Sequence, residues 1–443
     1  MKNLYLTFVC SVATMGGLMF GFDVAIISGA VPFIQEYFGW NELQLGWGVS
    51  SLLVGAIAGA FVSGPLSDRF GRRWLMLAVS LFFAVSCAGT AMAESPSVFI
   101  AMRLLGGISV GSVSVLAPMY VAEIAPMKVR GRLVSVYQLL ITFGILVSYF
   151  INYSLHDVAN NWRWMFASGI VPSVLYFVGL IFIPESPRWL FVKGETKRAK
   201  RILDGMLGPE EAAREVAQIG QNLEAPETSA VGSSGPAMLS NPANRKVLFV
   251  GFLLAVLVQM CGINTVIDYA PKILQEAGVE MRNALLQTSF IGIINFLATF
   301  FAIWLIEKLG RRKLYIIGSI AMMVTHGLLA GSFHYDLDPM VTLVCLLLFI
   351  ASFAAFIGPV FWTLVSEIFP NAIRGKGVAF ASFTQWIFNF LVILLFPVIF
   401  KSFGGVFSFL FFAVMCLIQL LVVYFMVPET KGKSLEEIEN FWK

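Results

Sequence analysis

Long apolar stretches separated by short polar segments dominate this 443-residue sequence. A bilayer core of about 30 Å requires roughly 20 apolar residues in a helix, and twelve stretches meet that length. With soft boundaries, they are 5–34, 46–66, 74–93, 98–122, 132–155, 165–184, 247–276, 284–307, 314–334, 340–369, 377–400 and 404–427. They are too long and continuous for the short alternating strands of a β-barrel. The pattern predicts an all-α membrane protein with twelve transmembrane helices.

Composition and charge distribution support a membrane protein. Only 13% of the residues are charged and 58% are hydrophobic, whereas a soluble domain carries about 25% charged residues. Most of the 30 Lys and Arg fall in alternate loops and near the two ends of the chain. This is the bias expected for cytoplasmic segments of membrane proteins. We therefore expect both termini in the cytoplasm, a location in the cell membrane, and a net charge of +4 that reflects topology and not nucleic-acid binding.

The two halves of the chain repeat each other. Glu123–Gly131 resembles Glu367–Gly375, and Pro184-Glu185-Ser186 resembles Pro428-Glu429-Thr430, at nearly one offset. Such self-similarity predicts two copies of a six-helix unit related as a parallel repeat, with substrate bound near the membrane midplane. The expected parts are an N-terminal bundle over 1–184, a cytoplasmic helical linker over 185–246, a C-terminal bundle over 247–427 and a cytoplasmic tail over 428–443.

Charged residues recur at the predicted cytoplasmic ends of the helices. Gly64–Arg73 combines a carboxylate, several cations and a glycine turn, and Glu307–Arg312 is its partner in the second half. Alone, such a loop could be an ordinary cytoplasmic loop, but its repetition favours a gate whose ion pairs form and break as the cytoplasmic face closes and opens. Each surface pair contributes about 0–1 kcal/mol, yet several together can bias a two-state equilibrium. The expected network comprises Asp68, Arg72, Arg73, Glu123, Arg130, Glu185, Glu307, Arg311, Arg312, Glu367, Arg374 and Glu429.

Several motifs together resemble one family, the sugar porters of the major facilitator superfamily. They are Gly64–Arg73, Arg130–Arg132, Pro184–Leu190, Gly262–Asn264, Gly358–Trp362 and Pro428–Gly432. The similarity extends from Gly16 to Lys433, and the family includes bacterial sugar–proton symporters and animal glucose facilitators. The resemblance implies two helical bundles that rock against each other, a monomeric functional unit, sugar and a proton as transported partners, and no cofactor. It is specific for the family and only weakly specific for the sugar.

Two opposite charges lie inside predicted membrane helices, Asp23 in the first and Arg103 in the fourth. An ionisable residue at membrane depth is a functional candidate by default. The structural alternatives are an Asp that caps a helix break and an Arg whose head reaches the interface. The resemblance implies that the two residues form the proton-coupling pair, since the facilitators carry Asn where Asp23 stands. If Asp23 binds a proton when Arg103 moves away from it, protonation and the conformational switch are thermodynamically linked.

Amide and aromatic side chains inside the predicted helices are candidate sugar ligands. Amides donate and accept hydrogen bonds, as sugar hydroxyls do, and aromatic faces can cover an apolar sugar face. For any single amide, an interhelical hydrogen bond is the plain alternative. The match of the whole set to the family implies a substrate site made of Phe20, Gln138, Gln259, Asn264, Asn295, Trp362, Gln385, Trp386 and Asn389.

The seventh predicted helix departs from the family pattern. Val258 precedes Gln259 where paired Gln is common, and Asp268-Tyr269 replaces an aromatic pair. Asp268, which we include among the candidate sugar ligands, could accept hydrogen bonds from the sugar, take part in proton movement or reach an external vestibule as a solvated group. These departures leave the identity of the sugar open.

The leading prediction is proton-coupled symport of a hexose or pentose. The alternatives are proton-independent sugar uniport, symport of a polyol such as inositol, a non-transporting sugar sensor and drug efflux. A short tail disfavours the sensor, and the amide-rich helices disfavour drug efflux. Enzymatic activity and a metal site are not expected, because the five Cys lie unpaired in apolar stretches and His156, His326 and His334 are scattered in predicted extracellular or near-extracellular positions without obvious partners.

Overall fold

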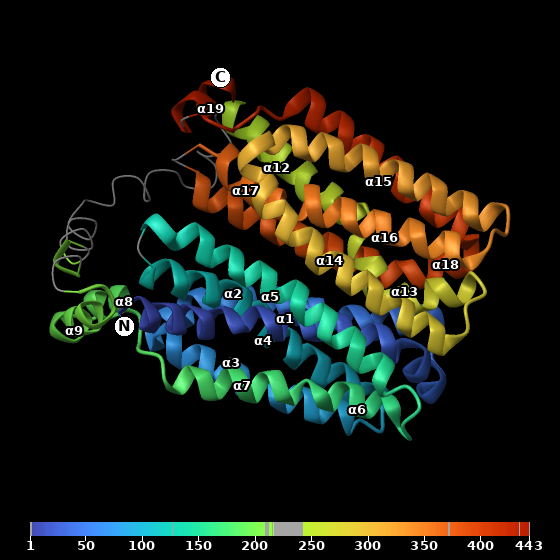
Figure 1. The fold of residues 1–443 in the computed structure, drawn as a ribbon, viewed down its shortest axis with the longest axis horizontal. Coiled ribbons are helices and arrows are strands. Elements are labelled where there is room, and N and C mark those ends of the chain that lie inside the picture. The colour runs from blue at the N-terminus through green and yellow to red at the C-terminus, as the bar shows by residue number, and fades with distance from the viewer. Residues whose placement is uncertain are drawn as a thin grey trace. The chain divides into compact units, whose positions relative to one another are not determined.

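The computed structural model describes residues 2–125, 127–208, 212–214, 216, 242–370, 373–433 and 435–442. Within these ranges all regular elements are helices, with no strand (Figure 1). Eleven of the described helical segments are long and apolar enough to cross a membrane. One of them, α18 (Arg374–Met426), has 53 residues and is kinked at Gly404, where φ is 78°, so that it comprises two helices. The prediction of an all-α protein with twelve transmembrane helices is confirmed.

Some spans are continuous helices and others are interrupted. The continuous ones are α1 (Lys2–Phe38), α2 (Glu42–Phe70), α3 (Arg72–Ala91), α4 (Pro96–Ile124), α5 (Met127–Ser154), α14 (Met281–Leu309) and α15 (Arg311–His334). The interrupted ones are the pairs α6 (Asn161–Ser168) with α7 (Ile170–Ile181), α12 (Pro242–Met260) with α13 (Ile263–Glu276), and α16 (Pro339–Phe356) with α17 (Gly358–Ile368). The sequence analysis predicted each of these pairs as one helix.

Shorter helices occupy the predicted linker and tail. The linker begins with α8 (Pro187–Val192) and α9 (Thr196–Leu207), and the tail ends with α19 (Leu435–Trp442). The predicted helical stretch from Thr196 to Leu223 is therefore helical in its first part, and 209–211, 215 and 217–223 lie outside the described residues.

The chain forms two compact units whose bounds differ from the four predicted segments. Unit 1 comprises 1–26, 51–148 and 158–227, and unit 2 comprises 27–50, 149–157 and 228–443. Helices α1, α2 and α5 thus contribute residues to both units. The predicted division into bundles, linker and tail follows the sequence repeat and stays a prediction.

Small residues bring α2 and α4 close together inside unit 1. Gly55 and Gly59 on α2 lie against α4, and Gly107 and Gly111 on α4 lie against α2. A Cβ atom added to any of the four would lie 1.9–2.1 Å from a backbone oxygen of the opposite helix. Such small-residue stripes are how membrane helices gain close van der Waals packing. Around this contact, α3 packs against α4, α6 and α7.

Unit 2 is built around α18. Helices α12 and α15 both pack against α18, and α16 packs against α14 and α15. A buried hydrogen bond joins two of these elements, because Gln419 Nε2 on α18 donates to Ser319 Oγ on α15 at 2.9 Å. Buried polar pairs of this kind stabilise the association of membrane helices. Apolar contact alone contributes little free energy there, because lipid is equally apolar.

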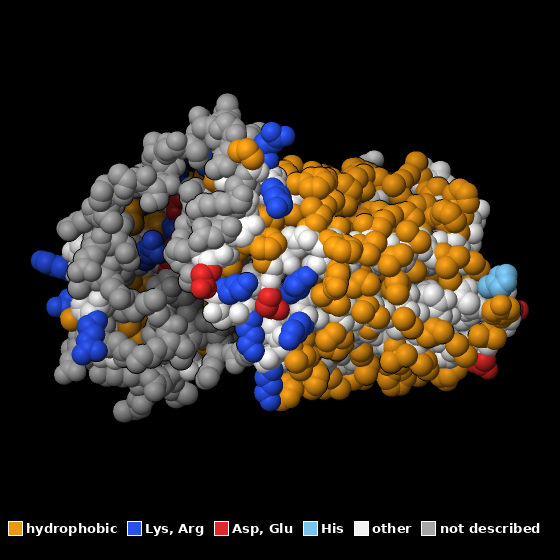
Figure 2. Space-filling model, turned by 90° about the horizontal axis from the view of Figure 1, so that it is seen from above, with side chains coloured by type: hydrophobic (Ala, Val, Ile, Leu, Met, Phe, Trp, Pro, Cys, Tyr) orange, Lys and Arg blue, Asp and Glu red, His pale blue; other side chains and the backbone are white. Residues whose placement is uncertain are grey.

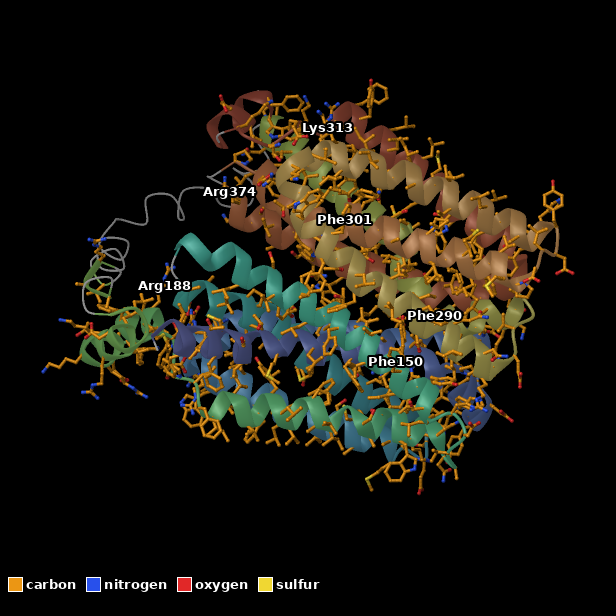
Figure 3. The ribbon with its side chains drawn as sticks, in the orientation of Figure 1. Phe150, Arg188, Phe290, Phe301, Lys313 and Arg374 are labelled. Atoms are coloured by element: carbon orange, nitrogen blue, oxygen red, sulfur yellow. The ribbon has the colours of Figure 1, made fainter. Side chains whose placement is uncertain are left out.

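Apolar side chains cover the flanks of the helices. Phe150, Phe290 and Phe301 are 43%, 45% and 52% exposed (Figure 3). Figure 2 shows a broad hydrophobic band on one face, with Lys and Arg gathered at one end of it. A surface of this kind is suited to lipid, in agreement with the apolar helices. The chain is therefore a multi-pass membrane protein.

Candidate functional site

The first component of the candidate site is a buried ion pair in unit 1. Arg103 Nη1 on α4 donates to Asp23 Oδ1 on α1 at 2.8 Å. The two side chains are only 2% and 4% exposed. The guanidinium carbon of Arg103 also lies 5.6 Å from the ring centre of Phe166, which is a cation–π contact. The structure thus brings together the two charges that the sequence places in separate membrane helices.

The ion pair is held by a single hydrogen bond. Asp23 Oδ2 and the Nε and Nη2 atoms of Arg103 are buried and have no hydrogen-bond partner among the described residues. A bidentate Arg–carboxylate pair would use two parallel hydrogen bonds and would be correspondingly harder to separate. Removal of one partner from such a buried pair would leave an uncompensated charge. A pair joined by one hydrogen bond can separate when the carboxylate of Asp23 binds a proton.

The second component is a helix interruption in unit 2. Helix α12 ends at Met260, and α13 begins at Ile263 after Gly262, whose φ is 81°. This left-handed conformation is readily adopted by glycine and terminates helices. A Cβ atom at Gly262 would also lie 2.8 Å from the ring of Phe412. The interruption places the last turn of one half-helix beside the first turn of the next.

Three amides meet at this interruption. Asn264 Nδ2 on α13 donates to Gln259 Oε1 on α12 at 2.8 Å and to Asn389 Oδ1 on α18 at 3.0 Å. We call Gln259, Asn264 and Asn389 the amide triad. Because both acceptor oxygens are used by Asn264, Gln259 and Asn389 keep their NH₂ groups as donors, while Asn264 keeps its carbonyl oxygen as an acceptor. A triad of this composition can bind a ligand that carries several hydroxyl groups.

The other predicted ligands lie on several helices. Phe20 on α1 and Gln138 on α5 are partly buried in unit 1. In unit 2, Asn295 on α14 is buried, Gln385 and Trp386 on α18 are partly buried, and Trp362 on α17 is 42% exposed. Direct hydrogen bonds join the amide triad within this predicted set.

Asp268 lies one turn after Asn264 on α13. It is buried, with 4% of its surface exposed, which disfavours the solvated alternative in this conformation. Its neighbours in sequence are both fixed, because Tyr149 donates to the Ile267 carbonyl at 2.8 Å and Tyr269 donates to the Ile393 carbonyl at 3.1 Å. These two bonds fix the backbone that carries Asp268.

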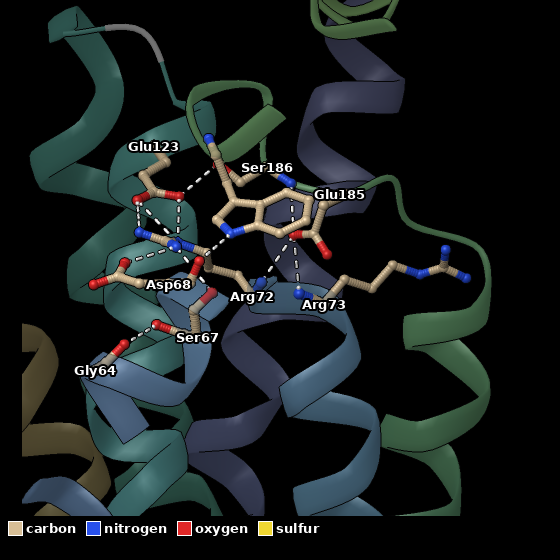
Figure 4. A network of polar contacts seen from close by, with 9 residues as sticks. Gly64, Ser67, Asp68, Arg72, Arg73, Glu123, Glu185 and Ser186 are labelled. Atoms are coloured by element: carbon tan, nitrogen blue, oxygen red, sulfur yellow. Dashed lines mark hydrogen bonds and ion pairs between the residues drawn. The ribbon is translucent and has the colours of Figure 1, made fainter. Parts of the chain in front are cut away.

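A network of charges occupies one end of unit 1 (Figure 4). Arg72 donates from Nε and Nη2 to the carboxylate of Glu123 at 3.0–3.2 Å and forms an ion pair with Asp68 at 3.0 Å. Glu185 Oε1 accepts the backbone N–H groups of Arg72 and Arg73 at 3.0 and 3.1 Å. The network therefore ties the start of α3 to the end of α4 and to the segment after α7.

Unit 2 contains a network with the same construction. Arg311 donates from Nη2 to Glu367 and from its backbone N–H to Glu429, each at 3.0 Å. Thr430 Oγ1 donates to Glu367 Oε2, as Ser186 donates to Glu123 in unit 1. Each member has its counterpart at the matching position of the sequence repeat, so the repeat extends from sequence to side-chain contacts.

The remaining members of the predicted charge network are three arginines that donate to main-chain carbonyls and two residues whose side chains are not described. Arg73 donates to the Leu180 and Ile181 carbonyls, and Arg312 donates to the Tyr424 carbonyl. Arg374 donates to the Phe369 carbonyl at 3.3 Å. Such bonds satisfy carbonyl groups at helix ends. The side chains of Arg130 and Glu307 lie outside the described part of the structure. The predicted gating role of these networks stays a prediction.

The carboxyl group of Glu185 is electrostatically unusual. Burial raises its pKa above the ordinary value, and the N–H groups of Ser186, Arg73 and Arg72 act in the opposite direction. Burial disfavours the charged form because water no longer solvates it. The same group fixes the chain between α7 and α8, so its ionisation is linked to the stability of that connection.

The contact of His326 was not predicted. The sequence placed this residue at an extracellular or near-extracellular position without an obvious partner, and the structure gives it a partner. His326 on α15 is fully buried, and its Nε2 lies 2.9 Å from the Cys261 carbonyl oxygen at the helix interruption. Its ring packs against Phe349, with ring centres 4.2 Å apart. The sequence offers no signal for this contact unless the interruption at Gly262 is already known.

A further polar cluster was not predicted either. We call it the outer cluster, because the predicted topology places the connection between α1 and α2, next to Glu42, on the external side. Lys272 Nζ on α13 donates to Glu42 Oε2 at 2.7 Å and to Gln35 Oε1 at 3.2 Å. Lys401 lies 3.3 Å from Glu42 Oε1. The side chains of Glu42 and Lys272 are each 14% exposed. All four residues belong to unit 2, where they join segments that are distant in sequence.

Comparisons with known proteins match the chain over almost its whole length. A family model described as "Sugar (and other) transporter" matches residues 9–442. The arabinose-proton symporter of Bacillus subtilis (strain 168) is 36% identical over 446 residues, which cover 99% of this chain and 95% of that protein. The D-xylose-proton symporter of Escherichia coli (strain K12) is 37% identical over 482 residues, covering 100% and 96%. An inward open structure of the xylose transporter XylE from E. coli aligns with a TM-score of 0.89 and 36% identity, covering 99% and 100%.

Proposed function

The chain belongs to the sugar transporter family, and from this premise we propose that it carries a monosaccharide together with a proton across the cell membrane. The proposed substrate is a hexose or a pentose, because relatives at 36–37% identity are named for the symport of the pentoses arabinose and xylose and for the transport of the hexose glucose. The proposed orientation has both termini in the cytoplasm, which the distribution of Lys and Arg supports. The proposed functional unit is a monomer, and no cofactor takes part.

The observation that carries the proposal is the buried hydrogen bond of 2.8 Å between Asp23 and Arg103. A carboxylate at this depth is energetically tolerable when it is paired or when it is protonated. A conformational change that withdraws Arg103 would therefore be coupled to proton uptake by Asp23. By reciprocity, the proton bound from the outer side favours that conformational change. A proton gradient can thus drive the transport cycle.

The amide triad supplies the sugar-binding part of the mechanism. Its donors and its acceptor match the hydroxyl groups of a sugar, which both donate and accept hydrogen bonds. Sugar binding replaces the hydrogen bonds that the sugar makes with water, so only a well-oriented set of amides gives net affinity. The aromatic residues Phe20, Trp362 and Trp386 are proposed to cover the apolar faces of the sugar.

Transport by reconstituted proteoliposomes tests the coupling role. With Asp23→Asn, accumulation of sugar under an imposed inward proton gradient should be lost, whereas exchange of labelled sugar without a gradient should continue. Asn keeps the shape of Asp, but its neutral amide does not bind and release a proton as a carboxylate does. The matched control is Glu94→Gln, which neutralises an exposed carboxylate of the same unit and should leave accumulation unchanged. Equal loss of accumulation and exchange in Asp23→Asn would remove Asp23 from the coupling role.

The same vesicles distinguish the alternatives. Uptake by the unaltered protein that ignores the proton gradient would indicate uniport. A competition panel of D-xylose, L-arabinose, D-glucose and myo-inositol would separate an aldose carrier from a polyol carrier. Binding of a sugar without any uptake would indicate a sensor. We expect uptake that rises with an inward proton gradient and is inhibited best by one of the aldoses.

A further inference from the structure

We propose that His326 is a positioning residue, whose Nε2–H holds the interrupted helices α12 and α13 in the geometry in which Gln259 and Asn264 bind the sugar. The inference rests on the proposed function, because it assigns a role in the same sugar site. His326 lies on α15 and belongs to neither half-helix. It acts on the site through the main chain and does not need to contact the sugar.

The need for such a residue follows from the interruption itself. In an uninterrupted helix, each carbonyl accepts the N–H group four residues later. At the interruption, the Gly262 N–H bonds to the Gln259 carbonyl at 3.1 Å, three residues back. The left-handed Gly262 turns the chain at this point. A carbonyl at a helix end that is buried in the membrane must find another donor, because no bulk water is available.

His326 supplies this donor for the Cys261 carbonyl. A carbonyl oxygen only accepts, so the 2.9 Å contact assigns the proton to Nε2 of the imidazole. The residue is fully buried, and its ring is enclosed by Phe349, Phe409 and Phe412 with ring centres 4.2–6.0 Å apart. This aromatic enclosure fixes the ring, and the fixed ring in turn fixes the carbonyl.

The held carbonyl lies between two members of the amide triad. Gln259 precedes Cys261 by two residues on α12, and Asn264 follows it by three on α13. Their mutual hydrogen bond of 2.8 Å crosses the interruption. Any rotation of one half-helix against the other therefore changes this distance and with it the position of both amides. Loss of the His326 donor should loosen the sugar site rather than the proton site, because the Asp23–Arg103 pair lies in unit 1.

Sugar affinity measured by titration calorimetry in detergent tests the inference. The probe is whichever of D-xylose, L-arabinose, D-glucose and myo-inositol binds the unaltered protein most tightly. His326→Phe keeps an aromatic ring and removes only the donor, and it should raise the Kd about tenfold, as expected for one lost hydrogen bond. His326→Gln can place an amide N–H near the position of Nε2, and it should stay within about threefold of the unaltered Kd. His326→Leu is a second donor-free variant with the same expected rise in Kd of about tenfold, and it replaces His326→Phe if that variant does not fold.

A matched control and a double-mutant cycle separate positioning from plain stability. Gln419→Leu removes another buried hydrogen bond of α15, that between Gln419 and Ser319, and leaves the bond of His326 to the Cys261 carbonyl in place. It should lower the melting temperature and leave the Kd unchanged. With Asn264→Ala already present, His326→Phe should change the Kd by less than about twofold, because the two residues act through one site.

The outcomes also separate this inference from the proposed function. An unchanged Kd in folded His326→Phe, failure of His326→Gln to restore affinity, or additive effects in the cycle would each overturn the positioning role. Sugar binding by the unaltered protein would remain intact in all three cases. Absence of binding by the unaltered protein to every sugar of the panel would instead contradict the proposed function itself.

Discussion

At the scale of single residues, one amide organises the candidate sugar site. Asn264 uses its two N–H groups to hold Gln259 and Asn389, which come from different helices. Because the acceptor oxygens of both partners are thereby occupied, their own N–H groups are oriented as donors. The specificity of the site thus depends on the donor capacity of a single side chain. Hydrogen-bonding sites of this kind discriminate strongly, since an unmatched buried group is costly.

Asn264→Asp tests this dependence with almost no change in shape. The carboxylate cannot donate to either partner, so both hydrogen bonds are lost, and the amides of Gln259 and Asn389 must turn their N–H groups towards the carboxylate and away from the sugar. We expect the Kd for the sugar to rise about tenfold or more, given roughly 0.5–1.5 kcal/mol for each net hydrogen bond. Titration calorimetry measures the Kd, and a melting curve confirms that the variant is folded. Asn161→Asp, which introduces the same charge at the start of α6, serves as the control; equal affinities of the two variants would contradict the prediction.

The sequence identifies some of these residues as functional candidates and gives no signal for others, and the difference has a physical reason. Asp23 and Arg103 stand out because an unpaired charge in an apolar stretch is expensive, so each implies a partner. His326 gives no such signal, since a neutral imidazole can be accommodated wherever one carbonyl is free. The triad members are recognisable as polar residues in apolar helices. Their mutual contacts depend on where α12 is interrupted, and that information is absent from the pattern.

At the scale of elements, the helix spans follow from the apolar stretches, but their interruptions do not. Gly251 and Gly262 both stand in one apolar stretch, yet α12 continues through the first and ends before the second. Glycine is common in membrane helices, and neighbouring helices satisfy the backbone when one is broken. A phenylalanine ring alone does not decide the position of the break, because one lies against each of the two glycines. The contact of His326 with the Cys261 carbonyl is found at the second glycine, where the helix ends. The break between α16 and α17 differs, because Pro359 in the first turn of α17 is a local signal for a new helix.

Glu185 shows how a side chain can fix the junction between elements. Its Oε1 accepts three N–H groups, from Arg72, Arg73 and Ser186, and so joins the start of α3 to the start of α8. Glu429 repeats this role for α15 in unit 2 with the N–H groups of Arg311 and Thr430. The matched carboxylates explain why Pro-Glu-Ser and Pro-Glu-Thr occur at equivalent positions.

The pH dependence of this junction can be predicted. Burial raises the pKa of Glu185 in the folded protein, so its contribution to stability is complete below the ordinary pKa and is lost as the pH rises through the folded-state pKa. Glu185→Gln keeps an acceptor oxygen and cannot ionise. Between about pH 4 and pH 8, the melting temperature of the unaltered protein should therefore fall relative to that of Glu185→Gln.

The control for this measurement is Glu195→Gln, which changes an exposed carboxylate in the turn before α9. Its melting temperature should track that of the unaltered protein across the whole range. Parallel curves for Glu185→Gln and the unaltered protein would show that Glu185 has the same pKa in the folded and unfolded states, which would contradict the prediction.

At the scale of the whole molecule, the repeat accounts for the two matching charge networks but not for the outer cluster. Glu42, Lys272, Gln35 and Lys401 join α1 and α2 to α13 and α18 within unit 2. Transport by alternating access, in which the substrate site opens to one side of the membrane at a time, requires contacts on the outer side to open once in each cycle. Since Lys272 and Glu42 are largely buried, their charge-assisted hydrogen bond is stronger than an exposed ion pair. The outer cluster is therefore expected to stabilise the outer-closed conformation.

Glu42→Gln should shift the protein away from that conformation. The substitution weakens the bonds to Lys272 and Lys401, and a change of about 1.4 kcal/mol would alter the ratio of conformations about tenfold. Spin labels on Leu43 and Glu276, both exposed in unit 2, report the separation of the joined segments by double electron–electron resonance. We expect a larger population at long distance in Glu42→Gln and in Lys272→Met.

Glu36→Gln removes a charge near the end of α1 that forms no ion pair among the described residues, and should give the unaltered distribution. If all three variants gave that same distribution, the outer cluster would have no part in closing the outer side.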